Sequence, residues 1–531
     1  MANRVNYKIT LKNHPPVFGS VVRPNGALHI VEELPEDTVV KVEASLNVPL
    51  SAEGRIFMNG YQSWTFCPEY DRNGRTRGIG HLPGRVIDHY GLDRYGDYNF
   101  VNYPAKPGIT HGMSYCYFRE GEDYRLVGSL DERPGYTLFQ YDSASHELRL
   151  ERDCAGMRCG GAFHAFDIYF AHGREENVFD AWFGAMGVKA RTQEKLAGYT
   201  SWYNRYENIS AETIRADLEG CIGRLQPGDM FQIDDGWEPG VGDWLEADPA
   251  KFPEGMKAAA DAIHAAGFRA GLWLAPFCAR TDSRVFREHP DWFLKDRNGG
   301  PWRAGCNWGN FYGLDIDHPG VIAYLEQVFD RVLNDWGYDL VKLDFLYAAA
   351  PFGSERESRA GRMIRAMELL REWCGYKKIL GCGVPVMPAF GLVEYCRVGC
   401  DVTLDWDDKL YMRLIHRERP STRHSLGNTV FRRQLNGRAF LSDPDVFFLR
   451  DDNIRLTKKQ KNMIALLDAV LGGVLLHSDD MSKYSDEAKA QYRALRHLRG
   501  AQNVRIETDG RWKLRCELDD QPYEMELDDL P

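Results

Sequence analysis

The chain has 531 residues, of which 44% are hydrophobic and 27% charged, and its formal net charge is −11. This composition is typical of a globular protein with more than one domain. The acidic charge, without any run of Lys or Arg, argues against nucleic acid or an anionic membrane as a partner. No apolar stretch approaches the roughly 20 residues that cross a membrane, and no secretory signal opens the chain. We therefore predict a cytoplasmic protein whose 12 cysteines are reduced.

Short runs of alternating apolar and polar residues dominate the first part of the chain. They include TVVKVEASLNV (38–48), YTLFQYD (136–142) and FDIYFAHG (166–173), separated by stretches with Gly, Pro, Asn and Asp. Many short strands at close spacing indicate a β-sandwich. We predict an N-terminal β-sandwich domain over residues 1–190, with no helix in its first 150 residues. A first helix, at 174–191, is expected where the chain leaves this domain.

The pattern changes to a repeat of strand, loop and helix after residue 195. Helices such as PEGMKAAADAIHAAG and PGVIAYLEQVFDRVLNDWG open with Pro and close with Gly, as helices do. Eight strands with helices between them predict a (β/α)8 TIM barrel over residues 195–485, with a doubly wound open sheet as the alternative. No G-x-G-x-x-G or Walker motif supports a nucleotide site. The predicted strands are 199–203, 230–234, 269–276, 340–345, 378–383, 395–399, 438–443 and 473–479.

The remainder of the chain, residues 486–531, is short. It opens with a helical segment, and NVRIETDGRWKLRCELDD (503–520) predicts a β-hairpin that turns at Asp509 and Gly510. One hairpin is only marginally stable alone. We therefore predict a short C-terminal helix and β-hairpin segment that packs on the barrel.

Charged residues recur where the predicted barrel strands end, and barrels of this kind carry their chemistry at that edge. Asp234 and Asp235 follow the second strand, while Lys342 and Asp344 lie in the fourth. Positions two apart on a strand point the same way, so Lys342 and Asp344 share one face of an apolar strand. Buried charges are costly unless they are paired or used. We favour a functional role for this pair over a plain internal ion pair.

Further acids follow the later strands, and several carboxylates at one barrel mouth are hard to explain by structure alone, because like charges repel. Arg397 lies in the sixth strand and Asp401 just beyond it. In the LDWDDK segment Asp405 is a rival for Asp401. The other acids near strand ends are interpreted as structural or surface groups, namely Asp407, Asp408, Asp443, Asp445, Asp479 and Asp480.

No metal site and no cofactor are predicted. The His residues lack H-x-H or H-E-x-x-H spacing, and a G-x-S-x-G nucleophile elbow is missing from the sequence. Chemistry by two carboxylates remains, with one as nucleophile or base and the other as proton donor, and such a pair cleaves glycosidic bonds. The aromatic content of 12% also suits a neutral polyhydroxylated ligand that stacks on rings.

Five segments follow one another in the barrel region: QIDDGWEPGVGDW, GLWLAPF, VKLDFLYA, CRVGCDVTLDW and SDPDVFFLR. Together with NGYQSW in the sandwich region, they resemble a glycoside hydrolase family 36 α-galactosidase of the compact bacterial branch. The resemblance implies exo-acting hydrolysis of terminal α-D-galactosyl residues from oligosaccharides or glycoconjugates, by double displacement with retention. The oligomeric state stays open, although members of that family often form homo-oligomers. α-N-Acetylgalactosaminidase and α-galactosyl transferase activities of the same family stay open, as does a catalytically silent carbohydrate-binding protein.

The resemblance also assigns roles by position. It makes Asp344 the catalytic nucleophile and Asp401 the acid/base, with Lys342 keeping Asp344 ionised. Substrate-binding roles fall on seven residues: Asp234 and Asp235 hold the 4- and 6-hydroxyls of galactose, Lys342 bonds ring hydroxyls, Arg397 lies near the 2-hydroxyl, and Trp273, Trp202 and Trp64 form aromatic walls.

Overall fold

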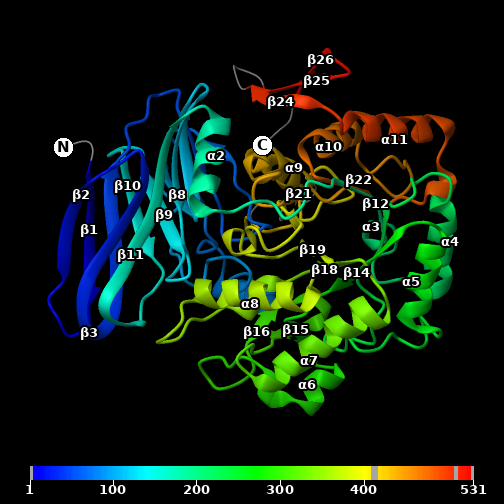
Figure 1. The fold of residues 1–531 in the computed structure, drawn as a ribbon, viewed down its shortest axis with the longest axis horizontal. Helices are drawn as coiled ribbons and strands as arrows, with labels where there is room; N and C mark the ends of the chain where they lie inside the picture. The colour runs from blue at the N-terminus through cyan, green and yellow to red at the C-terminus, as the bar shows by residue number, and fades with distance from the viewer. Residues whose placement is uncertain (1–3, 408–415, 508–511, 528–531) are drawn as a thin grey trace.

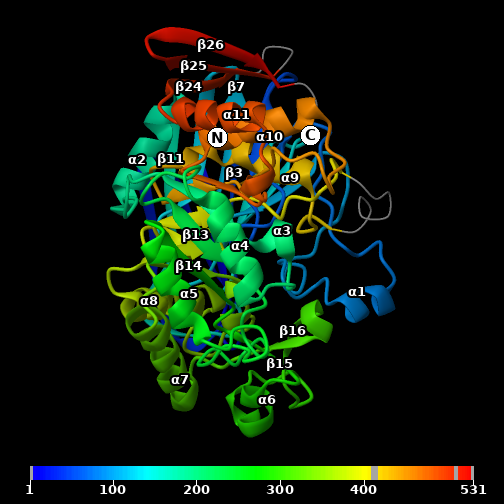
Figure 2. The same ribbon diagram turned by 90° about the vertical axis from the view of Figure 1, so that its right-hand side faces the viewer.

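The computed structural model describes residues 4–407, 416–507 and 512–527. Antiparallel sheets from the first third of the chain lie on one side of the molecule, and a ring of parallel strands with its helices lies on the other (Figure 1). A small C-terminal sheet lies at one end, next to α11 (Asp486–Leu498) (Figure 2). No helix among the described residues is both long and apolar enough to span a bilayer.

The N-terminal unit is an antiparallel β structure of 11 strands. The 22-residue strand β3 belongs to both of its sheets: its first half pairs with β11, and its second half pairs with β1 and β10. The inward side chains form one apolar core, as alternation along the strands predicts. The predicted N-terminal β-sandwich is confirmed, with its two sheets joined through β3. The strands are β1 (Arg4–Leu11), β2 (Val17–Val22), β3 (Gly26–Asn47), β4 (Arg55–Met58), β5 (Glu69–Tyr70), β6 (Ile109–Met113), β7 (Tyr115–Glu120), β8 (Asp123–Ser129), β9 (Thr137–Asp142), β10 (Glu147–Arg152) and β11 (Arg158–Gly173).

One helix interrupts this unit where none was predicted. α1 (Gly84–Tyr90) buries none of its residues and ends at Gly91 in the left-handed conformation. A helix without an apolar face leaves no periodic signal in the sequence, so strand alternation alone could not predict it.

Parallel strands form the second unit, and their order closes into a ring. β21 (Leu441–Asp443) pairs with β20, and β22 (Val446–Phe447), which follows after only two residues, pairs with β23. β21 and β22 together therefore form one barrel strand, interrupted at Pro444 and Asp445, and the ring has eight barrel strands. The predicted (β/α)8 barrel is confirmed. The other barrel strands are β12 (Leu196–Thr200), β13 (Met230–Ile233), β14 (Arg269–Leu274), β18 (Leu340–Leu343), β19 (Lys378–Gly381), β20 (Tyr395–Arg397) and β23 (Val474–His477).

Helices follow most of the barrel strands, and their N-terminal capping residues are of the types that the sequence predicts. Ser210 accepts a hydrogen bond from the Thr213 N–H at the start of α4, as its position predicts. The first predicted strand is shorter than expected, because the chain turns at Ser201 into a helix that contains Trp202. The helices are α3 (Trp202–Arg205), α4 (Ala211–Cys221), α5 (Gly255–Ala265), α6 (Arg284–Glu288), α7 (Pro319–Asp330), α8 (Arg359–Cys374), α9 (Thr422–Phe431), α10 (Lys458–Leu471) and α11.

The alternation of strand and helix is interrupted between β19 and β20. A 3-10 turn (Met387–Ala389) stands there in place of an α-helix. α2 (Glu175–Met186), the predicted exit helix of the sandwich, packs against this connection (Figure 1). The rings of Trp182 and Phe183 lie 6.1 and 5.3 Å from that of Phe390. A helix of the sandwich unit thus covers the part of the barrel where the connection between two strands has no α-helix.

Two small sheets complete the fold. β15 (Cys278–Arg280), β16 (Arg303–Gly305) and β17 (Phe311–Gly313) form an insertion after β14 that was not predicted. The predicted C-terminal β segment is confirmed but has three strands, β24 (Gln502–Glu507), β25 (Lys513–Leu518) and β26 (Gln521–Glu526). The ring of Trp512, which directly precedes β25, packs 5.1 Å from that of Phe431 on α9. The predicted turn at Asp509–Gly510 lies outside the described residues.

A loop of the sandwich unit, residues 59–67, is fastened to the barrel by Arg432 at the end of α9. This side chain is fully buried and donates to Asn59 Oδ1 (3.0 Å), to the Ser63 carbonyl (2.8 Å) and, on the barrel, to the Val398 carbonyl (3.0 Å). The Ser63 N–H in turn donates to the Val384 carbonyl at 2.9 Å. These bonds hold the loop that carries Trp64.

Arg432→Met should loosen this loop, because the substitution leaves buried carbonyl groups without a donor, at about 1–3 kcal/mol for each group. We expect the melting temperature in calorimetry to fall by about 5 °C or more. Arg455→Met is the matched control, since the Arg455 side chain is 83% exposed. Equal melting temperatures for the two variants would contradict this role of Arg432.

Candidate active site

The ends of β13 and β18 bring an ion pair to the barrel mouth. Lys342 Nζ lies 2.8 Å from Asp234 Oδ2, which also accepts from Gln232 Nε2 at 2.7 Å. Burial lowers the pKa of Lys342, but the acidic groups around it, Asp234 first, together raise that pKa above its ordinary value. The bonded partner of Lys342 is therefore Asp234, and Lys342 acts on Asp344 only through its charge.

Asp344 lies at the end of β18 and is buried. Its Oδ2 accepts from Trp273 Nε1 at 3.2 Å and its Oδ1 from the Phe345 N–H at 2.8 Å. Burial raises the pKa of Asp344, the charge of Lys342 opposes this shift, and the charge of Asp401 adds to it. The charge of Lys342 thus favours the ionised form of Asp344, and burial favours the protonated form. The Phe345 backbone has a φ of 53°, a strained conformation for a bulky residue that is typical of functional sites.

Arg397 on β20 holds Asp401 in place. Its Nη1 donates to Asp401 Oδ1 at 2.9 Å. Its Nε donates to Asp443 at 3.2 Å and its Nη2 to Asp445 at 2.8 Å, both on the interrupted strand β21/β22. The Arg397 side chain is 3% exposed, whereas that of Asp401 is 43% exposed. Asp401 is therefore anchored on one side and open to solvent on the other.

Asp443 and Asp445 have the structural role that was predicted for them. Besides Arg397, Asp445 accepts from the Tyr203 hydroxyl at 2.5 Å and from the Val402 N–H at 2.8 Å. Burial raises the pKa of Asp445, and Arg397 opposes this shift. Tyr203 was not singled out in the sequence, because it lies two residues beyond the turn that ends β12.

Asp235 has different partners from its neighbour Asp234. Its Oδ2 accepts from Trp308 Nε1 at 2.8 Å, and burial and the charge of Glu238 raise the pKa of its carboxyl group. Neither Trp308 nor Glu238 was predicted as a site residue. Trp308 lies between β16 and β17 with a φ of 52°, and its ring is 6.0 Å from that of Trp273. Glu238 could have been found as the acid three residues after Asp235.

Aromatic rings surround Asp344. Trp273 is buried beside it, and Trp64, from the sandwich loop, lies edge-on to Phe345 at 5.2 Å and donates to Cys382 Sγ at 3.3 Å. Trp202 packs edge-on against Tyr206 at 5.2 Å, and the pKa of Tyr206 is raised by burial and by the charges of Asp401 and Asp445. Trp202 therefore lies on the Asp401 side of the site.

A family model described as Melibiase matches residues 201–368. The chain carries a melibiase domain. Within the matched range lie Trp202, Asp234, Asp235, Trp273, Lys342 and Asp344, while Trp64, Arg397 and Asp401 lie outside it.

Curated relatives match over parts of the chain. An A type blood alpha-D-galactosamine galactosaminidase from Flavonifractor plautii is 37% identical over 139 residues, which cover 24% of this chain and 13% of that protein. An alpha-galactosidase from Escherichia coli is 30% identical over 185 residues, 32% of this chain and 25% of the relative. The matches thus span a quarter or less of these relatives.

Solved structures match over almost the whole chain. An alpha-galactosidase from Thermus thermophilus in complex with p-nitrophenyl alpha-D-galactopyranoside has a TM-score of 0.76 at 29% identity, covering 99% of this chain and 100% of that one. A GH36 alpha-galactosidase from Geobacillus stearothermophilus, at 11% identity, shares the fold with a TM-score of 0.61 and coverage of 97% and 79%. The resemblance to glycoside hydrolase family 36 is confirmed.

The remaining acids around the melibiase domain have local partners. Asp407 binds Arg419 at 2.6 Å, and Asp405 lies 3.7 Å from Arg455. Asp479 accepts from the Leu449 N–H (2.6 Å) and the Tyr484 hydroxyl (2.9 Å), and Asp480 caps the turn at Met481–Lys483. Asp408 lies outside the described residues.

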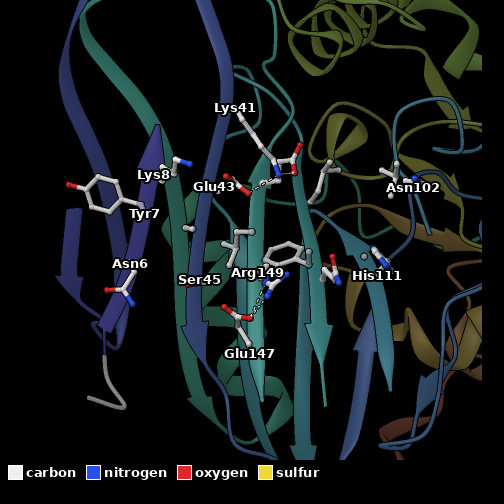
Figure 3. A pocket seen from close by; sticks show the side chains of 18 of the residues that line it. Asn6, Tyr7, Lys8, Lys41, Glu43, Ser45, Asn102, His111, Glu147 and Arg149 are labelled. Carbon is white, nitrogen blue, oxygen red and sulfur yellow. Dashed lines mark hydrogen bonds and ion pairs between the residues drawn. The ribbon is translucent and has the colours of Figure 1, made fainter. Parts of the chain in front are cut away.

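A groove of about 580 Å³ lies over strands of the sandwich unit (Figure 3). Its charged side chains bind one another: Lys41 lies 2.6 Å from Glu43 and 3.3 Å from Glu151, and Arg149 lies 2.7 Å from Glu147. Such pairs are typical of a solvated sheet face.

Proposed function

We propose that the chain is a retaining, exo-acting α-galactosidase that hydrolyses terminal α-D-galactosyl residues of oligosaccharides or glycoconjugates. The observation that carries the proposal is the pair of carboxylates Asp344 and Asp401 at the mouth of a melibiase barrel. Asp344 is buried among hydrogen-bond donors, whereas Asp401 is held by Arg397 and is half open to solvent. The two hydrogen-bond donors at Asp344 stabilise its carboxylate form, as a nucleophile requires, and the open side of Asp401 gives a leaving group access to it.

In the proposed reaction Asp344 attacks the anomeric carbon while Asp401 protonates the departing oxygen. Asp401 then removes a proton from water, which hydrolyses the galactosyl-enzyme. Trp273 Nε1 and the Phe345 N–H orient the Asp344 carboxylate. The exposed side of Asp401 leaves room for the leaving group and then for water.

Asp234, Asp235 and Lys342 are the proposed ligands of the sugar hydroxyls. They are buried near the ends of β13 and β18, the strands on either side of β14, and offer charged acceptors and a donor, which suits a neutral polyhydroxylated ring. The aromatic side chains of Trp273, Trp308 and Trp64 supply the walls on which its apolar face would stack. A structure of the Thermus enzyme holds stachyose, and an oligosaccharide substrate is proposed here as well.

A second candidate function is removal of α-linked N-acetylgalactosamine or galactosamine. The 37% identity to the Flavonifractor galactosaminidase favours it. The two activities would differ in the space around the 2-substituent, where we propose that Arg397 lies.

Hydrolysis of p-nitrophenyl glycosides should decide between them. We expect turnover of the α-galactoside to exceed that of the α-N-acetylgalactosaminide by about 100-fold or more, a ratio that one unaccommodated substituent can produce. The reverse ratio would support the second candidate. Hydrolysis of neither substrate, with galactose still bound, would identify a catalytically silent binding protein.

A further inference from the structure

The carboxylate of Asp234, a proposed ligand of the sugar, accepts hydrogen bonds on both of its oxygens. Its Oδ2 accepts from Lys342 Nζ at 2.8 Å, from Gln232 Nε2 at 2.7 Å and from the Thr200 hydroxyl at 3.3 Å. Its Oδ1 accepts from the Asp235 N–H at 3.0 Å. Each carboxylate oxygen has about two lone-pair sites, so the protein occupies Oδ2, and Oδ1 keeps a site for a hydroxyl of the sugar.

Gln232 connects this carboxylate to the neighbouring strand β12. It lies on β13, two residues before Asp234, and is 1% exposed. Its amide nitrogen donates to Asp234 Oδ2 and to the Thr200 hydroxyl (3.1 Å), and that hydroxyl donates in turn to Asp234. An amide turned the other way would place its oxygen against the carboxylate, and two acceptors cannot bond to each other. Asp234 therefore determines how the amide of Gln232 lies.

The oxygen of the same amide has no such use. Gln232 Oε1 is buried, and no group of the described residues donates a hydrogen bond to it. A buried acceptor without a donor lowers stability, so an amide present only for stability would be satisfied at both ends. The hydrogen bonds of Gln232 therefore serve Asp234 rather than the general stability of the barrel.

We propose that Gln232 is a positioning residue that sets the orientation of the Asp234 carboxylate toward the sugar. The inference rests on the proposed function, which makes Asp234 a ligand of a galactose hydroxyl. Lys342 alone would leave the carboxylate free to turn, because an ammonium group is a compact charge with rotatable donors. The planar amide of Gln232 is a second donor to the same oxygen, and it holds Oδ1 toward the bound sugar.

Substitutions of Gln232 should weaken hydrolysis. Gln232→Met keeps the length of the side chain without the donor, and Gln232→Glu puts an acceptor in its place. We expect kcat/KM for p-nitrophenyl α-galactoside to fall about 10-fold or more in both, as for a lost hydrogen bond to a charged group. Thr200→Val removes only the longer bond and should cost about threefold. Gln327→Met, on an exposed position of α7, is the matched control and should equal the wild type.

Substrate analogues that lack one hydroxyl separate positioning from a structural defect. Asp234 acts on the hydroxyl that it binds, so the effect should vanish on at least one of the 4-deoxy and 6-deoxy p-nitrophenyl α-galactosides. On that analogue kcat/KM of Gln232→Met and of the wild type should agree within about threefold. A loss of the same size on the galactoside and on both analogues would show a general structural defect and overturn the inference.

A double substitution tests whether Gln232 acts through Asp234. Gln232→Met should raise the galactose Kd, measured by calorimetric titration, about 10-fold in the wild type but less than about twofold in an Asp234→Ala background. Equal factors in both backgrounds, or normal hydrolysis by Gln232→Met, would overturn the inference alone. A wild type that neither hydrolyses α-galactosides nor binds galactose would overturn the proposed function, and with it the role of Asp234 at a sugar.

Discussion

Asp344→Ala and Asp344→Asn should each lose about four orders of magnitude or more in kcat on every α-galactoside, since no galactosyl-enzyme can form. The loss should be the same for p-nitrophenyl α-galactoside and melibiose, because the leaving group does not change the missing step. Steady-state kinetics on both substrates measures this. Asp335→Asn, on a 53% exposed side chain, is the matched control and should retain full activity.

Azide can show that the Asp344 variants are folded and lack only the nucleophile. In Asp344→Ala a small anion can occupy the space of the lost carboxylate and attack the anomeric carbon from that side. One displacement inverts the configuration, so rescue should yield the β-galactosyl azide. Rescue to the α-azide would contradict the assignment of Asp344 as nucleophile.

Asp401→Ala should depend strongly on the leaving group. A p-nitrophenolate departs with little protonation, so the galactosyl-enzyme still forms and its slow hydrolysis limits the rate. The sugar alcohol of melibiose needs the proton, and its cleavage should fall about 100-fold further, within the range that general acid catalysis contributes. Comparing kcat/KM for the two substrates measures the difference.

Azide should accelerate Asp401→Ala on the aryl substrate, because the anion attacks the galactosyl-enzyme without a general base. Two displacements retain the configuration, so the product should be the α-galactosyl azide. Asp405→Ala is the comparison variant, as the rival acid four residues away. If Asp405→Ala shows the leaving-group dependence and the azide effect while Asp401→Ala does not, the acid/base role belongs to Asp405.

Local sequence patterns determined much of this protein. Alternation along β18 put Lys342 and Asp344 on one face, and the strand and helix repeats after residue 195 predicted the barrel. These features depend on neighbours a few residues apart, whose periodicity the chain displays directly. α1 and the insertion that holds Trp308 lack such a periodicity, and neither was predicted.

Only the tertiary structure decided which charges pair. Lys342 binds Asp234, 108 residues away, rather than Asp344 on its own strand. Arg397 donates hydrogen bonds both to Asp401 and to Asp445 on the interrupted strand β21/β22. Trp308 donates to Asp235, which lies 73 residues away in the sequence. Closure of the barrel brings these side chains together. The order of the strands around the barrel and the length of each side chain then determine which charged groups form hydrogen bonds. Sequence spacing carries no information about such distances, because they depend on how the whole ring closes.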